Sequence, residues 1–470
     1  MSVTLLVLLG YVALITAVGL AIGRRVRGTA DFFVAGRSMG PWLLFATLLA
    51  ANIGAGSTVG AASLGYEDGL AAWWWVGSAG IGTLVLAGWL GPKLWRIAKD
   101  ADLLTVGDYL EHRYGPSVRA TVAVLLWFVT LASLAGQLIA MATILQVVAG
   151  APEWLGAVAG GFVMLIYFVA GGLLSSAWVN LVQLVVLFAG FLLAVPLAVQ
   201  GVGGLDALLQ APAGSPDYLS FWGSGASGWT IVFIVAPAFV VSPGILQKTF
   251  GAANEVAVRR GVTACGLVLL AFAFLPPLLG MAARVVAPEL DNADLALATV
   301  LLEAVPPAVG LLGLAAVLSA EISSADAILF MLATSLSKDL YKRFVNPDAS
   351  DRQILQVARL SAVAGGLLAM ILALTLQSVI QALTVFYAIL GVSLFIPVVA
   401  GIYTRRPGVP EALAAIGAGV SALVVSALAP DQRWIPGFTP AALGLMASAV
   451  GFVLWFVFRR SSLWTEGGKR

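Results

Sequence analysis

The sequence feature that most constrains the fold is the recurrence of long apolar runs, about thirteen of them, each close to the roughly 20 residues that an α-helix needs to cross a bilayer core. They occur along almost all of the 470 residues. Sixty per cent of the residues are hydrophobic and 10% are charged, which is more apolar than a water-soluble core requires. The sequence therefore predicts an all-α polytopic membrane protein.

The predicted membrane-spanning segments are separated by short connections, so we expect a single transmembrane domain over residues 1–470. The longest connections are 93–116 and 201–227. A β-barrel is excluded, because its strands would give weakly alternating segments of about ten residues. The approximate boundaries of the segments are 2–23, 41–66, 70–92, 117–148, 153–173, 176–200, 228–247, 261–286, 305–337, 355–376, 378–403, 410–430 and 437–458.

The distribution of basic residues predicts the orientation of the chain. Lysine and arginine concentrate in cytoplasmic loops of membrane proteins. With the N-terminus outside, all of the 25 lysines and arginines except Arg284 and Arg433 fall on the inner side. This favours an odd number of crossings, and we expect a multi-pass protein of the cell membrane with an external N-terminus and a cytoplasmic C-terminus.

Several classes of function are excluded by what the sequence lacks. His112 is the single histidine and Cys265 the single cysteine, so histidine-based metal sites, catalytic triads and internal disulfides are not available. His112 is expected to be a solvated residue of the cytoplasmic stretch 100–115. No Walker-type phosphate loop occurs, and the net charge of +2 suggests no nucleic-acid partner.

Two carboxylates lie within the ninth predicted segment, where ionisable side chains are expensive and are functional candidates by default. They are Glu321 and Asp326, in the sequence AEISSADAILF. On an ideal helix they point about 140° apart, so they cannot both face one ion. Ser323 and Ser324 lie between these directions, and their hydroxyl oxygens suit a hard cation. The alternative is that these groups only satisfy one another and neighbouring helices by hydrogen bonds.

Two other segments carry residues that interrupt helices. The segment 41–66 contains AANIGAGSTVGAA. The stretch APAFVVSPGILQK covers the end of the segment 228–247 and the lysine that follows it, and its prolines remove backbone donors. Secondary transporters commonly place interrupted helices at corresponding positions of two inverted repeats. The two segments are the second and the seventh of the predicted series, so they lie five segments apart. This spacing predicts two inverted repeats of five helices each, over approximately 41–200 and 228–403. The remaining predicted helices, at 2–23, 410–430 and 437–458, would be peripheral.

Four motifs, in this order, resemble the sodium:solute symporter family, which has the leucine-transporter fold. They are DFFVAGRSMGPW at 31–42, LLTVGDYLEHRYG at 103–115, SPGILQKTFGA at 242–252 and SLSKDLYKR at 335–343. The resemblance covers most of the chain. It implies two inverted repeats of the leucine-transporter type and a transport function.

The resemblance also implies a sodium site between the interrupted second segment and the ninth segment. Its ligands would be the carbonyl oxygens of Ala50, Ile53 and Ala320 and the hydroxyls of Ser323 and Ser324. One position departs from the family, because Asn180 replaces an aspartate that usually supports sodium coupling. Asp326 is a candidate replacement for this charge. Asp326, Glu321 and Asn180 are therefore candidates for a second cation or proton site.

The solute is expected to bind beside the cation. The candidate solute-binding residues are Ser57, Thr58, Trp75, Gln137, Ser242, Gly244 and Tyr387. The sugar-binding branch of the family has a glutamate and a glutamine at positions resembling Val76 and Ser57, so a sugar is disfavoured. The choline branch has aromatic residues at positions resembling Asn52 and Gly244, which weakens a cation–π cage here.

We therefore predict sodium-coupled symport of a small organic solute by alternating access, with the lipid bilayer as the other partner and with no prediction of oligomeric state. The alternatives are a proton-coupled or uncoupled carrier of the same fold, a channel, and a membrane sensor that binds solute without transporting it. An intramembrane enzyme is not expected, because no nucleophile is paired with a base.

Overall fold

The computed structural model describes residues 3–23, 37–210, 217–223, 228–404, 408–428 and 438–467. Residues 31–36 of the first motif and Arg433 lie outside the described residues. The first helices are α1 (Val3–Gly23), α3 (Pro41–Asn52), α4 (Val59–Asp68), α5 (Trp73–Val85), α6 (Gly91–Asp100), α7 (Val106–Tyr114), α8 (Pro116–Ala149), α9 (Glu153–Gly201) and α10 (Leu205–Gln210). The later ones are α11 (Val232–Val241), α12 (Pro243–Phe250), α13 (Glu255–Phe272), α14 (Leu275–Val286), α15 (Ala296–Glu303), α16 (Pro307–Thr334), its continuation η7 (Ser335–Val345), α17 (Asp351–Ala373), α18 (Val379–Tyr403), α19 (Val409–Leu428) and α20 (Pro440–Gly467).

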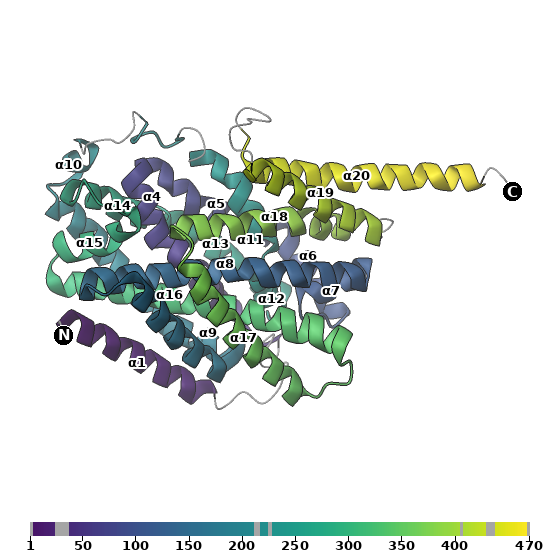
Figure 1. Ribbon diagram of the computed structural model, residues 1–470, viewed down its shortest axis with the longest axis horizontal. Helices are drawn as coiled ribbons and strands as arrows, with labels where there is room; N and C mark the ends of the chain where they lie inside the picture. The colour runs from purple at the N-terminus through teal and green to yellow at the C-terminus, as the bar shows by residue number, and fades with distance from the viewer. Residues whose placement is uncertain are drawn as a thin grey trace.

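The long helices run roughly along one axis, and the described ends of the chain lie at opposite ends of it (Figure 1). We call these the N-terminal end, where α10, α14 and α15 lie, and the C-terminal end, where α6 and α7 lie. Within the described residues, ten helices are long and apolar enough to cross a membrane, and three more are apolar but shorter. The all-helical membrane fold is confirmed, whereas the count of thirteen crossings stays a prediction.

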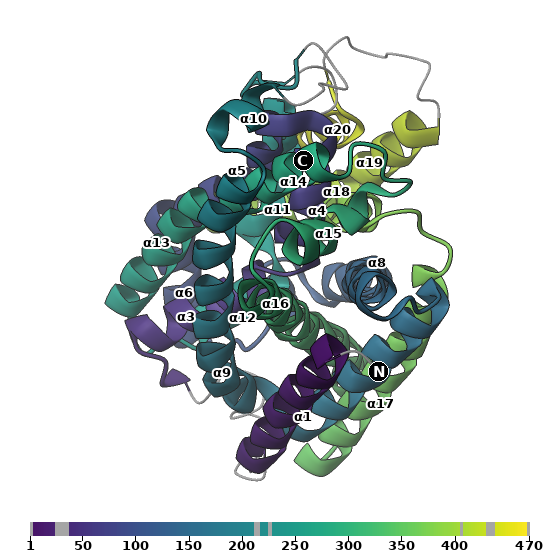
Figure 2. The same ribbon diagram turned by 90° about the vertical axis from the view of Figure 1, so that its left-hand side faces the viewer.

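The helices pack as two groups with α18 between them. The first helix group consists of α3–α6 and α11–α14, in which α13 packs on α3 and α5 and α14 packs on α4. The second helix group consists of α8, α9, α16 and α17. Figure 2 shows α8 and α16 side by side in the middle of the molecule, with α1 and α17 along one edge and α19 and α20 along the opposite edge.

Several predicted segments differ from the observed helices. The segment 41–66 is two helices, α3 and α4, and 228–247 is divided between α11 and α12. The segments 153–173 and 176–200 belong to one long helix, α9, even though Gly171 and Gly172 lie close to the predicted boundary at 174–175. Lys248 was expected in a connection, but it lies within α12 and exposes only 2% of its surface.

Two arginine-centred clusters organise the C-terminal end. Arg119 of α8 forms ion pairs with Asp108 at 2.8 Å, Glu111 at 2.8 Å and Asp339 of η7 at 2.7 Å. We call these four residues the Arg119 cluster. It joins α8 of the second helix group to α7 and η7, which both pack on α8.

The second cluster belongs to the first helix group. Arg37 donates hydrogen bonds to the carbonyl oxygens of Phe250, Ala98 and Leu103 and pairs with Asp102. This Arg37 cluster holds the start of α3 against the ends of α6 and α12. His112, by contrast, is exposed on α7, as expected.

Candidate functional site

The first interruption separates α3 from α4. Ile53 and Gly54 adopt extended backbone conformations, with φ/ψ of −102°/103° and −144°/−154°. Residues 55–57 form a single 3₁₀ turn before α4 begins at Val59. The carbonyl oxygens around residue 50 therefore lack the regular i+4 partners of a continuous helix, and they are available to side chains or to an ion.

The two serines predicted as cation ligands lie directly against this interruption. Ser323 Oγ lies 2.9 Å from Ala50 O and 3.0 Å from Ala320 O, so its single proton can be donated to either carbonyl oxygen. Ser324 Oγ lies 3.0 Å from Ile53 O. The structure thus brings together all five oxygens that the family resemblance implies as ligands, namely those of Ala50, Ile53, Ala320, Ser323 and Ser324. We call them the five-oxygen cluster.

The chemistry of this cluster differs from that of transition-metal sites. All five oxygens are carbonyls or hydroxyls, which hard cations prefer. Elsewhere in the described residues no group of three or more His, Cys, Asp or Glu side chains could hold a metal ion. The cluster is buried, since Ala50, Ser323 and Ser324 expose 1%, 1% and 3% of their surfaces. It is therefore suited to a small desolvated alkali cation, with no formal negative charge among its oxygens.

The second interruption separates α11 from α12. Ser242 has φ/ψ of −53°/124°, which is not helical, and Pro243 restarts the helix as its first residue. Proline suits this position because it lacks an N–H that would otherwise be unpaired there. Pro237 lies within α11 without ending it. The SPG sequence, and not the earlier proline, therefore sets the break.

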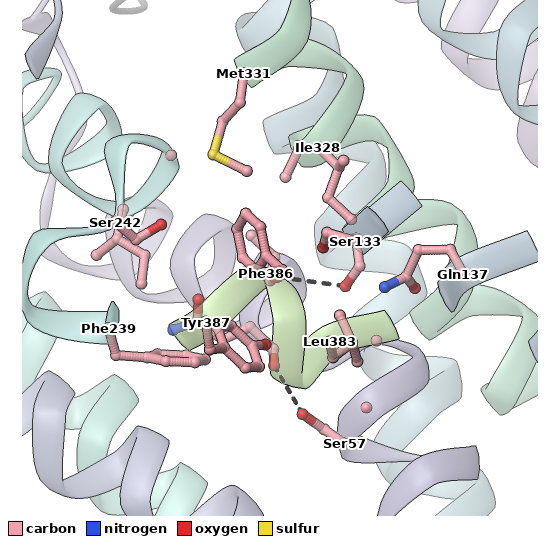
Figure 3. A pocket seen from close by; sticks show the side chains of 18 residues that line it. Ser57, Ser133, Gln137, Phe239, Ser242, Ile328, Met331, Leu383, Phe386 and Tyr387 are labelled. Atoms are coloured by element: carbon pink, nitrogen blue, oxygen red, sulfur yellow. Dashed lines mark hydrogen bonds between the residues drawn. The ribbon is translucent and has the colours of Figure 1, made fainter. Parts of the chain in front are cut away.

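A cavity lies between the two interruptions. Its volume is about 60 Å³, several times the roughly 10–15 Å³ that one water molecule needs. Figure 3 shows Phe239, Phe386 and Tyr387 grouped between Ser242 on one side and Gln137 on the other. Ser324, a member of the five-oxygen cluster, also lines the cavity. A solute bound here would therefore lie beside the proposed cation site.

Most of the predicted solute-binding residues line this cavity. Those that do so are Ser57, Gln137, Ser242, Gly244 and Tyr387. Gln137 Oε1 accepts a hydrogen bond from the N–H of Ala55 at 3.0 Å, which fixes the amide beside the first interruption. Charged side chains do not occur among the described residues of the lining. Sequence reasoning missed the other lining residues with polar or aromatic groups, Asn52, Ser133, Phe239 and Phe386.

Two predicted solute-binding residues lie outside the cavity lining. Trp75 packs against Tyr387, with ring centroids 5.9 Å apart, so it supports the wall from behind. Thr58 donates a hydrogen bond to Glu321 Oε1 at 2.8 Å. Glu321 is fully buried, so this contact ties the start of α4 to α16.

The candidates for a second cation or proton site have separate surroundings. Glu321 contacts Thr58 of α4, whereas Asp326 interacts electrostatically with Lys248 of α12. The hydrogen bond of Glu321 is thus to α4, and it stays a prediction that the two carboxylates point in different directions. Asn180 is fully buried on α9. Lys248 was missed by the sequence reasoning because its position beside an apolar segment is typical of a loop lysine.

Comparison with known proteins places these features in a family. The model of the "Sodium:solute symporter family" matches residues 32–419. A sodium/glucose cotransporter of Vibrio parahaemolyticus is 27% identical over 417 residues, covering 79% of this chain and 75% of the relative. A sodium/pantothenate symporter of Escherichia coli is 27% identical over 475 residues, covering 96% and 95%.

A solved structure agrees with these comparisons at the level of the fold. The substrate-bound, outward-open state of a Na⁺-coupled sialic acid symporter superimposes with a TM-score of 0.79, at 18% identity and over 97% of each chain. The family model spans both interrupted helices, the five-oxygen cluster and the cavity between them. This chain belongs to the sodium:solute symporter family.

Proposed function

We propose that this protein couples the uptake of a small organic solute to sodium by binding both at the interruptions of α3/α4 and α11/α12. The observation that supports the proposal most directly is the five-oxygen cluster, in which Ser323 and Ser324 lie within 3.0 Å of the Ala50 and Ile53 carbonyl oxygens. Sodium would use the carbonyl lone pairs together with those of the two hydroxyls, which can rotate to direct their protons away.

The cavity favours one chemical class of solute. Its polar groups are neutral, with Gln137, Ser57 and Ser242 as hydrogen-bonding side chains, and its aromatic rings offer an apolar wall. The N-terminus of α12 begins at the cavity, where unpaired N–H groups and the helix dipole favour a negative group. We infer a small solute with a carboxylate and an apolar portion, bound with that carboxylate toward Gly244 and Ile245.

Transport would proceed by alternating access. The first helix group carries both interruptions, and the second carries Ser323 and Ser324, so a cation in the five-oxygen cluster would bridge the two groups. Binding of sodium would thereby favour the conformation in which solute binds. We place the N-terminus outside and the C-terminus in the cytoplasm of the cell membrane, as the distribution of basic residues predicts.

The energy available is sufficient for concentrative uptake. One monovalent cation moving down about 100 mV gains about 2.3 kcal/mol, and a tenfold concentration gradient adds about 1.4 kcal/mol. Since each 1.4 kcal/mol corresponds to a factor of ten, one sodium supports a solute gradient of about 500-fold.

A thermal-shift screen followed by uptake tests this proposal. Purified protein is screened against amino acids, other carboxylates, quaternary amines and sugars, in sodium chloride and in N-methyl-D-glucamine chloride at equal ionic strength. We expect a carboxylate to raise the melting temperature in sodium only. Proteoliposomes loaded without sodium should then concentrate that solute when sodium is added outside.

The other outcomes separate the alternatives. If a solute stabilises the protein equally with and without sodium, and an imposed pH gradient drives its uptake, the coupling ion is the proton and not sodium. Sodium-dependent stabilisation without uptake or counterflow would indicate a sensor. If only sugars or quaternary amines stabilise the protein, the inferred solute class is wrong while the sodium coupling is retained.

A further inference from the structure

A fully buried carboxyl group lies beside the first interruption. Glu321 of α16 exposes 0% of its surface, and its Oε1 accepts a hydrogen bond from Thr58 Oγ1 at 2.8 Å. Its Oε2 is also buried and has no hydrogen-bond partner within the described residues. No charged side chain in the described part of the chain interacts with this carboxyl group. One hydrogen bond does not compensate a desolvated carboxylate, which is costly unless a positive charge lies close to it.

The hydroxyl of Thr58 adds a third oxygen at the same place. Thr58 exposes 0% of its surface, and its Oγ1 lies 2.8 Å from Glu321 Oε1 and 3.0 Å from Gly54 O. Its single proton can be donated to either oxygen, and donation to Gly54 O leaves the lone pairs of Oγ1 available beside the carboxylate. Carboxylate and hydroxyl oxygens are ligands that hard cations prefer. We call the two carboxylate oxygens and Thr58 Oγ1 the Glu321 oxygen set.

The Glu321 oxygen set is adjacent to the five-oxygen cluster but shares no atom with it. Glu321 precedes Ser324 by three residues on α16, and side chains at this spacing are neighbours on a helix, with Cβ atoms about 5–6 Å apart. On the facing chain, Ile53 O contacts Ser324, whereas Gly54 O contacts Thr58. The five-oxygen cluster has no formal charge. The charge of Glu321 would therefore offset the repulsion between cations bound in the two places.

The Glu321 oxygen set also joins the two helix groups. Thr58 lies at the start of α4, in the first helix group, and Glu321 lies on α16, in the second. We propose that Glu321 and Thr58 bind a second sodium ion, so that two sodium ions are coupled to each solute. This inference rests on the proposed function, because it counts the sodium ions that the transport cycle uses.

Sodium binding to purified protein tests the proposal through the number of ions bound. Radioactive sodium is titrated onto the chain and its variants in a scintillation proximity assay. We expect two sodium ions per chain and a Hill coefficient above 1.5 for the natural protein. Glu321→Gln keeps the size of the side chain but removes its charge, and it should bind one ion with a Hill coefficient of 1. Glu303→Gln, at an exposed glutamate of α15, is the control and should bind two.

Substitutions of Thr58 keep the test decisive if Glu321→Gln does not fold. Thr58→Val has nearly the same shape but lacks the hydroxyl, so the Kd of one of the two sodium ions should rise at least tenfold. Thr58→Ser retains the hydroxyl, and both Kd values should stay within threefold of the natural ones. Equal sodium binding by Thr58→Val and Thr58→Ser would overturn the proposal.

The outcomes also distinguish this inference from the function on which it rests. One sodium ion bound by the natural chain, or two ions bound by a folded Glu321→Gln, would overturn the second site alone. If the natural chain binds no sodium, the proposed function is wrong and this inference falls with it.

Discussion

At the scale of single residues, the Ser324 hydroxyl makes the most specific contribution to the five-oxygen cluster. It reaches Ile53 O at 3.0 Å and also contacts Ala51 O. Replacing Ser324 by alanine removes one proposed sodium ligand and leaves buried carbonyl oxygens without a partner. A polar contact to a charged group, here the sodium ion, contributes about 1.5–3 kcal/mol. We expect Ser324→Ala to raise the sodium Kd at least tenfold in a sodium titration.

The matched control is Ser319→Ala on the same helix. Ser319 is also buried, but its hydroxyl donates to Ala315 O within α16, away from the interruption. Its sodium Kd should stay within threefold of the natural value. Equal effects of the two substitutions would mean that the serines act only through helix packing.

Gly54 allows the backbone between α3 and α4 to lie in close contact with Ser324 of α16. A Cβ at this position would collide with Oγ and Cβ of Ser324 and would come within 2.9 Å of Gln137 Oε1. Gly54→Ala should therefore displace the interruption and abolish more than nine-tenths of sodium-driven uptake, while the protein still inserts. At Gly88 a Cβ would meet nothing within 4 Å, so Gly88→Ala should retain most of the uptake. Comparable rates of sodium-driven uptake for Gly54→Ala and Gly88→Ala would contradict the close contact between Gly54 and α16.

At the scale of elements, the Arg119 cluster should dominate the stability of the C-terminal end. Arg119 pairs with three carboxylates and exposes only 6% of its surface. Breaking such buried pairs costs about 3–5 kcal/mol, whereas an exposed pair contributes about 0–1 kcal/mol. We expect Arg119→Ala to lower the unfolding free energy in detergent by several kcal/mol. Arg343 also pairs with Glu111, but its side chain is 44% exposed. Arg343→Ala should therefore lower the unfolding free energy by less than about 1 kcal/mol.

The same cluster predicts a dependence of stability on pH. Burial alone would raise the pKa of Glu111, but hydrogen bonds from Arg343 and Arg119 outweigh it and lower that pKa. A carboxylate with a lowered folded-state pKa stabilises the fold above its unfolded pKa of about 4.3, and this stabilisation is lost as pH falls through the folded pKa. Glu111→Gln should therefore be less stable than the natural protein at pH 7, with the difference shrinking below pH 4.3. A difference that stays constant in melts from pH 7 to pH 3.5 would contradict this assignment.

The sequence predicted where helices are interrupted better than where two predicted segments join into one continuous helix. Glycines in 54–60 and the SPG sequence at 242–244 act locally on the backbone, so both breaks could be placed without tertiary information. The two predicted segments join into α9 although Gly171 and Gly172 lie near their boundary, so a glycine pair alone does not mark a break. Lys248 illustrates a further limit, since its hydrogen-bond acceptor, the carbonyl oxygen of Thr47, lies 201 residues away in the sequence and on another helix.

At the scale of the whole molecule, the two arginine clusters meet at one short connection. The carbonyl oxygen of Leu103 accepts a hydrogen bond from Arg37, while the N–H of Leu104 donates to Asp108 of the Arg119 cluster. Leu103 is thus bonded to the first helix group and Leu104 to the elements that pack on the second. The peptide between Leu103 and Leu104 therefore connects the two arginine clusters.

Two ligands that bridge the same pair of groups must affect each other equally. Sodium in the five-oxygen cluster and solute in the adjacent cavity would both contact α16 and the α3/α4 interruption, so both would stabilise one arrangement of the two groups. Linkage then requires that saturating sodium lower the solute Kd by the same factor by which saturating solute lowers the sodium Kd. We expect this factor to be about 5–150, measured by calorimetry for the solute and by radioactive sodium binding for the ion. A factor of 1 would mean that sodium and solute do not stabilise a common arrangement of the two helix groups. Coupling would then have to arise from the rates of the transport steps alone.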